Sequence, residues 1–296
     1  MENTRAKTTR NSLILLLTAT IWGMAFVSQS KGMDYMHPFT FNGVRSLIGA
    51  AGILVYILIS RKIAGDKAAK LDWKLNVRAG LLCGIFLTIA STLQQFGIKY
   101  TSVGKAGFIT TLYIIFVPMF GIFLKKKVAP VVWAAAGMAA VGMYLLCMTE
   151  SLRLGAGDIM VFLCAIAFAI QIMTVDHYAA RIDGAVVSCI QFTVCGVVCC
   201  IGALIWGQPT FGQIQEGLGA LLYAGVLSCG VGYTLQIVGQ KGLNPTVAAL
   251  IMSLESVIAT ISGWIAYKIG FLSTDQTLTP RQIAGCIIVF AAVILV

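Results

Sequence analysis

The feature that most constrains this chain is a series of ten hydrophobic runs, each bounded by charged residues, proline or glycine. They cover residues 12–30, 39–60, 77–98, 103–124, 131–147, 158–176, 185–206, 217–240, 245–267 and 280–296. Each run has 17 to 24 residues, and a helix needs about 20 residues to cross a hydrocarbon core of about 30 Å. Barrel strands are about half as long and alternate in hydropathy. The runs therefore predict an all-α integral membrane protein with ten transmembrane helices.

Composition and charge support this prediction. Apolar residues make up 58% of the 296 residues and charged residues 11%, against about a quarter in a typical soluble domain. If the N-terminus is cytoplasmic, 14 Lys and Arg residues lie on that side and 6 on the other, with Arg45 inside a span. This asymmetry predicts that both termini are cytoplasmic. We expect a multi-pass protein of the cell membrane, specifically a bacterial plasma membrane, whose net charge of +10 reflects topology and not a nucleic-acid partner.

Proline positions agree with the predicted span boundaries. Four prolines begin spans, where the missing N–H costs nothing, and these are Pro38, Pro130, Pro245 and Pro280. Asn244 and Thr279 precede two of them and are expected to cap the helices. Pro118 lies inside the span 103–124 and predicts a kink there.

The two halves of the chain are alike. Residues 92–124 align without gaps on residues 234–266, with nine identities in 33 positions, Gln94 with Gln236 among them. The alignment pairs the third span with the eighth and the fourth with the ninth, so the repeat unit is five helices, 1–150 and 151–296. Because five is odd, the second copy enters the membrane from the opposite side. Inverted repeats are typical of secondary transporters, in which one half rocks against the other.

Several short motifs resemble a known family. They are Trp22-Gly23, residues 104–110 (GKAGFIT), residues 244–248 (NPTVA), residues 254–257 (LESV) and Gly263-Trp264. With these motifs the whole chain resembles the ten-helix, EamA-type members of the drug/metabolite transporter superfamily. Lys268-Ile269-Gly270 departs from the Gly-Glu pair that such proteins often carry. The resemblance implies export or exchange of a solute through a cavity lined by helices of both halves.

Glu255 lies in the middle of the ninth span, ten residues from Pro245 and twelve from Tyr267. At 1.5 Å per residue this is about 15–18 Å from each end. A charged carboxyl at that depth costs about 2.5–3.5 kcal/mol, so it is functional by default. It can bind a proton, because desolvation disfavours its charged form, or pair with a cationic substrate. The alternative is a hydrogen-bonded Glu that holds helices together. The repeat places Tyr113 opposite Glu255, where its phenol contacts substrate or packs in the core.

Further polar and aromatic residues within spans are candidates for substrate or proton binding. They are Trp22, Gln94, Thr110, Tyr233, Gln236 and Ser256. For the two glutamines a helix–helix hydrogen bond is the alternative to a place at the cavity rims. For Trp22 the alternative is packing. Ser256 follows Glu255 directly and does not share its helix face.

Arg45 and Asp158 are charged residues close to the outer side. Arg45 lies six residues into the second span, about 9 Å from that side. We favour a snorkelling side chain over a contact with a substrate anion. Asp158 completes a Gly-x-Gly-Asp pattern found in intramembrane aspartyl proteases, but such chemistry needs a second aspartate at the same depth. As the first acid of its helix, Asp158 suits the helix dipole.

The sequence contains no metal-binding, nucleotide-binding or nucleophile–base motif. We therefore expect no enzyme, no catalytic residue, no metal and no cofactor. The favoured hypothesis is a secondary active transporter, an exporter or exchanger of a small organic solute such as an amino acid or amine, with proton coupling. The alternative is a non-transporting membrane scaffold or sensor on the same fold. The expected partners are the solute and the lipid bilayer, and the oligomeric state is open.

Overall fold

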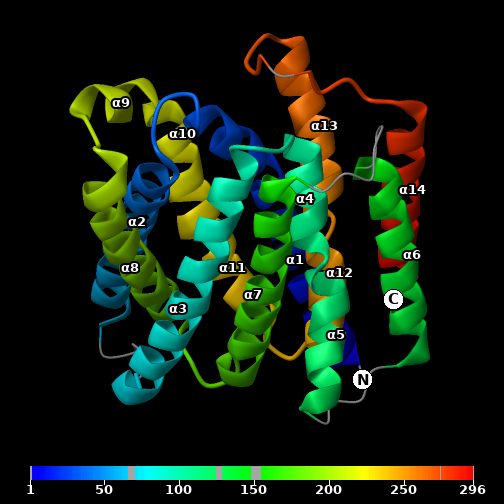
Figure 1. The fold of residues 1–296 in the computed structure, drawn as a ribbon. Coiled ribbons are helices and arrows are strands. Elements are labelled where there is room, and N and C mark those ends of the chain that lie inside the picture. The colour runs from blue at the N-terminus through cyan, green and yellow to red at the C-terminus, as the bar shows by residue number, and fades with distance from the viewer. Residues whose placement is uncertain (1, 66–70, 125–128, 148–154, 274, 296) are drawn as a thin grey trace.

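The structure is a computed structural model that describes residues 2–65, 71–124, 129–147, 155–273 and 275–295. Every regular element in these ranges is a helix (Figure 1). In chain order they are α1 (Glu2–Gly32), α2 (Pro38–Ala64), α3 (Trp73–Ile98), α4 (Val103–Thr111), α5 (Tyr113–Phe123), α6 (Pro130–Cys147), α7 (Ala156–Tyr178), α8 (Gly184–Gly202), the π-helix η2 (Ala203–Gly207), α9 (Phe211–Glu216), α10 (Leu218–Leu222), the π-helix η3 (Tyr223–Gly232), α11 (Tyr233–Gly239), α12 (Pro245–Met252), α13 (Glu255–Lys268) and α14 (Pro280–Ile294). The all-α prediction is confirmed for these ranges.

Eight segments of the described chain are helical, long and apolar enough to cross a membrane. They are Lys7–Gly32, Pro38–Ala64, Trp73–Ile98, Val103–Phe123, Ala156–Tyr178, Gly184–Gly207, Leu218–Gly239 and Pro245–Lys268. These segments match eight of the ten predicted runs. The runs 131–147 and 280–296 correspond to α6 and α14, which are shorter apolar helices. The chain is thus a multi-pass membrane protein, and the count of ten crossings stays a prediction.

The predicted helix starts are confirmed. α2, α6, α12 and α14 each begin at one of the four predicted prolines. The Asn244 side chain accepts a hydrogen bond from the backbone N–H of Thr246 at 2.9 Å. The Thr279 hydroxyl accepts one from the N–H of Gln282 at 3.3 Å. Both caps satisfy N–H groups of a first helical turn that have no partner within the helix.

Two of the spans are interrupted part-way. Leu112 separates α4 from α5, and Ser253 with Leu254 separates α12 from α13. At both places the backbone makes tight i to i−3 hydrogen bonds, from the N–H of Ile115 to Leu112 at 3.0 Å and from the N–H of Ser256 to Ser253 at 3.1 Å. Short tight turns inside a helix often mark a hinge.

The first interruption differs from the kink predicted at Pro118. Pro118 lies inside α5, six residues beyond the break. The break coincides instead with Thr111, whose hydroxyl donates to the carbonyl of Phe108 at 2.8 Å. In the second broken span, Ser253 donates in the same way to the carbonyl of Leu250 at 2.7 Å. These hydroxyls occupy carbonyls of the preceding turn, which is how Ser and Thr bend helices.

The helices of the first half pack largely against helices of the second half. α1 packs on α11 and α13, α2 on α8 and η3, and α3 on α7 and α8. α6 pairs with α14 at the right of Figure 1. In that pair a Cβ atom added to Gly142 would lie 2.9 Å from the carbonyl oxygen of Gly285, so glycine permits the two backbones to touch.

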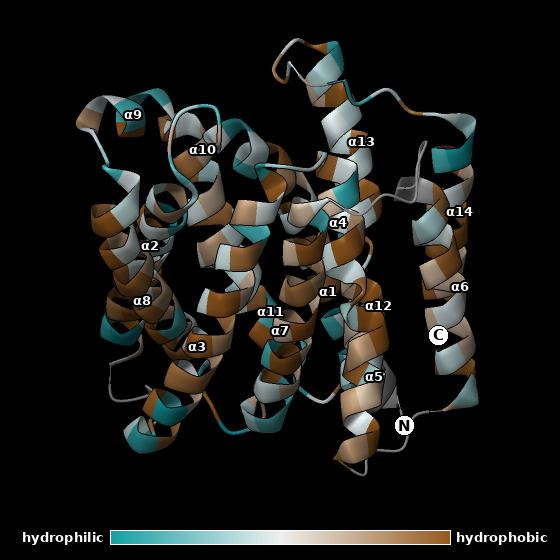
Figure 2. Ribbon diagram, viewed as in Figure 1, coloured by the Kyte–Doolittle hydropathy of each residue, from teal (hydrophilic) through white to brown (hydrophobic). Residues whose placement is uncertain are grey.

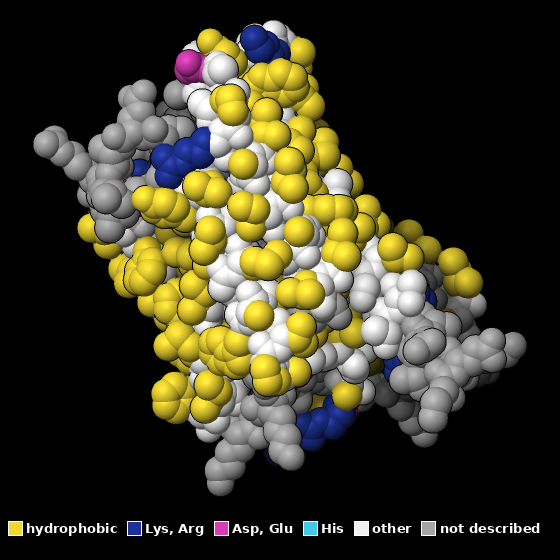
Figure 3. All heavy atoms as spheres, turned by 90° about the vertical axis from the view of Figure 1, so that its right-hand side faces the viewer, with side chains coloured by type: hydrophobic (Ala, Val, Ile, Leu, Met, Phe, Trp, Pro, Cys, Tyr) yellow, Lys and Arg dark blue, Asp and Glu magenta, His cyan; other side chains and the backbone are white. Residues whose placement is uncertain are grey.

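The outer surface is apolar across its middle. Figure 2 shows hydrophobic residues along most of the length of the helices, with hydrophilic residues gathered toward many helix ends. The face formed around α14 carries hydrophobic side chains over its central part, and the charged side chains visible there lie toward its two ends (Figure 3). This distribution suits a protein surrounded by lipid.

Candidate functional site

A narrow cavity lies inside the bundle, and nine helices contribute to its wall. Its lining residues are Trp22, Phe26, Gln29, Arg45, Gln94, Thr110, Tyr113, Phe168, Gln171, Ile172, Ser228, Tyr233, Gln236 and Glu255. They belong to α1, α2, α3, α4 and α5 in the first half and to α7, η3, α11 and α13 in the second. The cavity measures about 30 Å³, which accommodates water but not an organic solute.

Glu255 and Tyr113 meet in this cavity. The Tyr113 hydroxyl donates a hydrogen bond to Oε1 of Glu255 at 3.0 Å. The two side chains are 2% and 4% exposed, respectively. Each is the first residue after an interruption, at the start of α5 and of α13. The interruptions therefore place the phenol and the carboxyl against each other.

Aromatic rings form one wall of the cavity. The rings of Trp22 and Tyr233 lie 4.5 Å apart between centroids, and Phe192 packs edge-on against Tyr233 at 5.0 Å. The indole N–H of Trp22 is buried and has no hydrogen-bond partner among the described residues. A buried donor without a partner is costly, so this N–H is available to a group that enters the cavity.

Four amide side chains also line the cavity, those of Gln29, Gln94, Gln171 and Gln236. Gln94 donates to the Thr110 hydroxyl at 3.1 Å. Gln236 donates to Oε1 of Gln171 at 3.2 Å. The side-chain oxygen of Gln29 is buried without a partner in the described structure. The helix–helix hydrogen bond, which was the alternative prediction for Gln236, is therefore present. Gln236 also lines the cavity.

The structure brings seven of the eight predicted site residues to the cavity. These are Trp22, Gln94, Thr110, Tyr113, Tyr233, Gln236 and Glu255. Ser256 is buried but lies outside the lining, and its hydroxyl donates to the carbonyl of Ser253 at 2.8 Å. Its place on another helix face follows from its position directly after Glu255. That the seven bind substrate or a proton stays a prediction.

Arg45 is the residue that sequence reasoning placed wrongly. We expected its side chain to snorkel toward the outer side, but it is 5% exposed and lines the cavity. Its Nε donates to Oδ1 of Asn42 at 2.9 Å. The spacing of Asn42 and Arg45 was the available clue, because residues three apart share a helix face and an amide is a natural partner for a buried guanidinium.

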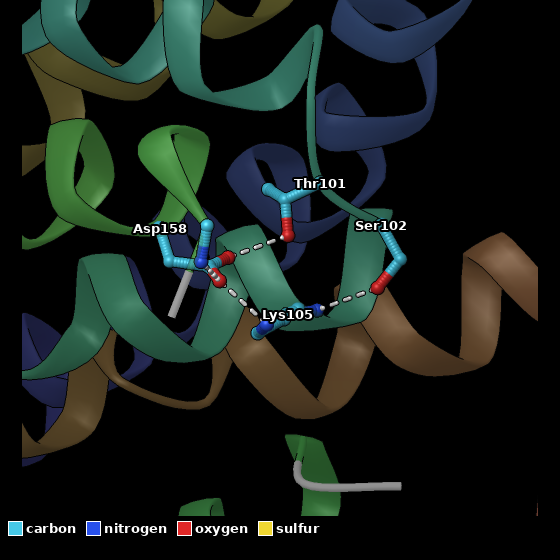
Figure 4. A network of polar contacts seen from close by, with 5 residues as sticks. Thr101, Ser102, Lys105 and Asp158 are labelled. Carbon is cyan, nitrogen blue, oxygen red and sulfur yellow. Dashed lines mark hydrogen bonds and ion pairs between the residues drawn. The ribbon is translucent and has the colours of Figure 1, made fainter. Parts of the chain in front are cut away.

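A second polar cluster joins the two halves near the upper ends of α4 and α7 in Figure 1. Nζ of Lys105 lies 2.6 Å from Oδ2 of Asp158. The Thr101 hydroxyl and the N–H of Gly155 also donate to this carboxylate, each at 2.9 Å. Figure 4 shows Lys105 and Thr101 pointing toward Asp158, and Ser102 capping the turn that carries Lys105. Asp158 is thus held as an ion-pair acceptor and not as half of an aspartate pair.

Within the described ranges, no group of three or more His, Cys, Asp or Glu side chains is placed to hold a metal ion. The polar groups of the cavity are instead one carboxyl, one guanidinium, the indole N–H of Trp22, amides and hydroxyls. These groups can form hydrogen bonds and ion pairs with a solute.

The fold and cavity define a class of protein, a multi-pass helical membrane protein with a polar cavity enclosed by both halves of the chain. Comparison with known proteins makes the class specific. The model of the EamA-like transporter family matches residues 10–148 and residues 155–296. The chain therefore belongs to the EamA-like transporter family, and the resemblance noted from its motifs is confirmed.

Individual relatives agree with this assignment. An uncharacterized transporter of Archaeoglobus fulgidus is 27% identical over 288 residues, covering 95% of this chain and 84% of the relative. The uncharacterized transporter YwfM of Bacillus subtilis is 25% identical over 257 residues, covering 85% and 84%. A crystal structure with 16% sequence identity superposes with a TM-score of 0.73, covering 97% of this chain and 96% of that one, and shows the same fold. Transport is thus favoured over the scaffold or sensor hypothesis.

Proposed function

We propose that this protein is a secondary active transporter that exports or exchanges a small organic solute by alternating access, coupled to protons. The observation that carries the proposal is Glu255, a buried carboxyl in a cavity walled by both halves of the chain. A carboxyl at membrane depth is costly and marks proton relays and substrate pathways. The expected partners are the solute, the proton and the surrounding lipid, with no nucleic acid and no cofactor.

The proposed architecture has ten crossings arranged as two inverted five-helix repeats, residues 1–150 and 151–296. Both termini would lie in the cytoplasm, and the protein in the cell membrane. Three observations support it. The family model matches each half separately. The packing of α3 on α7 has its counterpart in that of α11 on α1. The two interrupted spans, α4–α5 and α12–α13, are those that the repeat alignment pairs.

Alternating access follows from these parts. A cavity of about 30 Å³ must widen to admit a solute, and the interruptions before Tyr113 and Glu255 provide bending points beside the cavity. The Lys105–Asp158 ion pair joins the halves at one end, which is the outer end in the proposed topology. That end opens only when the pair separates. In the repeat alignment Val247 takes the place of Lys105, so the cation of this pair has no counterpart at the other end.

Coupling arises because a proton and a cationic group of the solute bind the same carboxylate. When Glu255 is charged and occupied by the solute, a proton cannot bind it. When the site is protonated, the solute is released. The Tyr113 hydroxyl donates to this carboxylate at 3.0 Å and holds it in the cavity. Exchange of one ligand for the other moves solute outward as protons move inward.

The test is flux of a labelled metabolite panel in proteoliposomes with an imposed pH gradient. Wild-type protein should move at least one solute, and Glu255→Gln should lose the response to the gradient while unfolding at an unchanged temperature. The matched control is Glu216→Gln, the same chemical change at an exposed residue of α9. Gradient-driven flux that persists in Glu255→Gln would rule out the coupling role. A wild-type protein that moves no solute would overturn the proposal as a whole.

A further inference from the structure

The cavity contains a second charged group, the guanidinium of Arg45. Its side chain is 5% exposed and faces the same space as Glu255. The ion pairs among the described residues are Lys31–Asp34 and Lys105–Asp158, so no described carboxylate lies within ion-pair distance of Arg45. A buried cation without a counter-ion is strongly disfavoured. The arrangement therefore favours an anionic group that enters from the cavity.

Arg45 is also held in one orientation. Its Nε donates to Oδ1 of Asn42 at 2.9 Å. The Asn42 amide nitrogen donates in turn to the Ser91 hydroxyl at 3.0 Å and to the Cys199 sulfur at 3.3 Å. The ring of Phe41 lies 5.6 Å from the guanidinium carbon. With Nε occupied, the two terminal amino groups are free of described partners, and such a fork binds a carboxylate through two parallel hydrogen bonds.

Arg45 and Glu255 are the charged residues among the described lining of the cavity. They come from opposite halves, α2 and α13, and are not paired with each other. The Trp22 and Tyr233 rings and the hydroxyl of Ser228 form the cavity wall along with them. One cavity thus offers a cationic fork, a carboxylate and an aromatic wall to the same ligand.

We infer that the transported solute is a zwitterion, whose carboxylate binds the terminal amino groups of Arg45 and whose ammonium group binds Glu255. This inference rests on the proposed function and names the class of its substrate. A solute with an ammonium group alone leaves Arg45 buried without a counter-ion. A solute with a carboxylate alone leaves Glu255 without a partner cation. Unpaired buried charges of this kind are the means by which a site rejects near relatives of its ligand.

The assignment separates the roles of the two charged residues. Proton and ammonium compete at Glu255, whereas only the solute's carboxylate binds Arg45. Loss of the Arg45 charge should therefore weaken binding of the zwitterion. It should not change binding of the corresponding amide, which has the ammonium group but no carboxylate. Asn42 acts through Arg45 and is a positioning residue.

The experiment measures ligand-induced thermal stabilisation of the purified protein, which rises with the ratio of ligand concentration to Kd. Two triplets share a carbon skeleton and differ in charge. They are leucine, leucinamide and 4-methylpentanoate, and phenylalanine, phenylalaninamide and 3-phenylpropanoate. In wild-type protein the amino acid should bind about tenfold to a hundredfold more tightly than its amide or its acid, the factor expected for one charge-assisted interaction. This comparison requires no variant to fold.

Variants test whether Arg45 causes the preference for the amino acid over its amide. Arg45→Gln should reduce amino-acid binding to the level of the amide and leave amide binding unchanged, and Arg45→Lys should restore part of the difference. The matched control is Arg78→Gln on the exposed side of α3, which should behave as wild type. The inference is overturned if the amide or the acid binds as tightly as the amino acid, or if Arg45→Gln keeps the preference. It is also overturned if the solute moved in the flux panel has an ammonium group but no carboxylate, a result that leaves the proposed function standing, whereas a solute without a cationic group would contradict both.

Discussion

The Lys105–Asp158 ion pair permits a quantitative test of how the two halves are held together. Its distance is 2.6 Å, and the side chains are 22% and 4% exposed. Exposed pairs contribute about 0.2–1 kcal/mol, whereas removing one partner of a buried pair costs about 3–5 kcal/mol. Because one side chain of this pair is buried and the other is partly exposed, we expect a coupling free energy between those two ranges, about 2 kcal/mol. That corresponds to a change of about thirtyfold in the equilibrium for local opening.

The assay is hydrogen exchange of the backbone amides at the starts of α4 and α7 in a double-mutant cycle. Lys105→Met and Asp158→Asn should each raise exchange there by about thirtyfold, and the double variant should raise it little further. The control is Lys31→Met, since Lys31 and Asp34 form a pair of 3.0 Å at the surface, with exposures of 22% and 49%. A coupling energy below about 1 kcal/mol, the upper limit for such surface pairs, would refute the view that this contact holds the end closed.

Three further predictions concern single positions. Tyr113→Phe removes the donor to Glu255 and should lower gradient-driven flux about tenfold, whereas the same change in a Glu255→Gln background should have no further effect; additive losses would contradict this. Gly97→Ala should lower the free energy of unfolding by about 1–3 kcal/mol, because its Cβ would clash with the Val161 side chain and lie 2.8 Å from the carbonyl oxygen of Gly157. Gly52→Ala, with open space around it, should not destabilise the protein in the same thermal unfolding assay.

The last of these predictions concerns His37, between α1 and α2, where burial and the nearby charge of Lys99 lower the pKa of His37 below its usual 6.5. The folded state therefore disfavours the protonated ring. The contribution of His37 to the free energy of unfolding should be constant above about pH 6.5, and it should fall as the pH drops from there toward the lower pKa of the folded state. His37→Asn should flatten thermal unfolding temperatures between pH 5 and 8, and an unchanged acid response would exclude His37 as its cause.

Much of this protein could be predicted from local sequence. The hydrophobic runs are confirmed as helices because a backbone in lipid must satisfy its own hydrogen bonds, and hydropathy therefore reports directly on each span. Proline and the capping residues Asn244 and Thr279 act within one helical turn, so their effects are visible in the sequence. The repeat alignment added one long-range contact, since it placed Tyr113 opposite Glu255, and the structure joins their side chains.

Other features depend on how the helices are rotated and packed. The sequence places Arg45 at a depth, but depth alone does not decide whether a side chain reaches toward water or into a cavity. The same limit applies to Lys105 and Asp158, which are 53 residues apart along the chain and meet only because α4 packs on α7. The π-helix η3 and the interruptions at Leu112 and Ser253 were likewise not visible in the hydrophobic pattern.

The sequence by itself therefore determined the all-α class of fold and the prolines that begin four helices, and it singled out Glu255 as the acid in the middle of a hydrophobic run, because each of these follows from interactions within one helix or between one residue and lipid. Only the tertiary structure decided which polar groups share a cavity. That outcome depends on contacts between helices far apart in the chain, and it turned Glu255 from an isolated acid into one of two opposite charges around a common space.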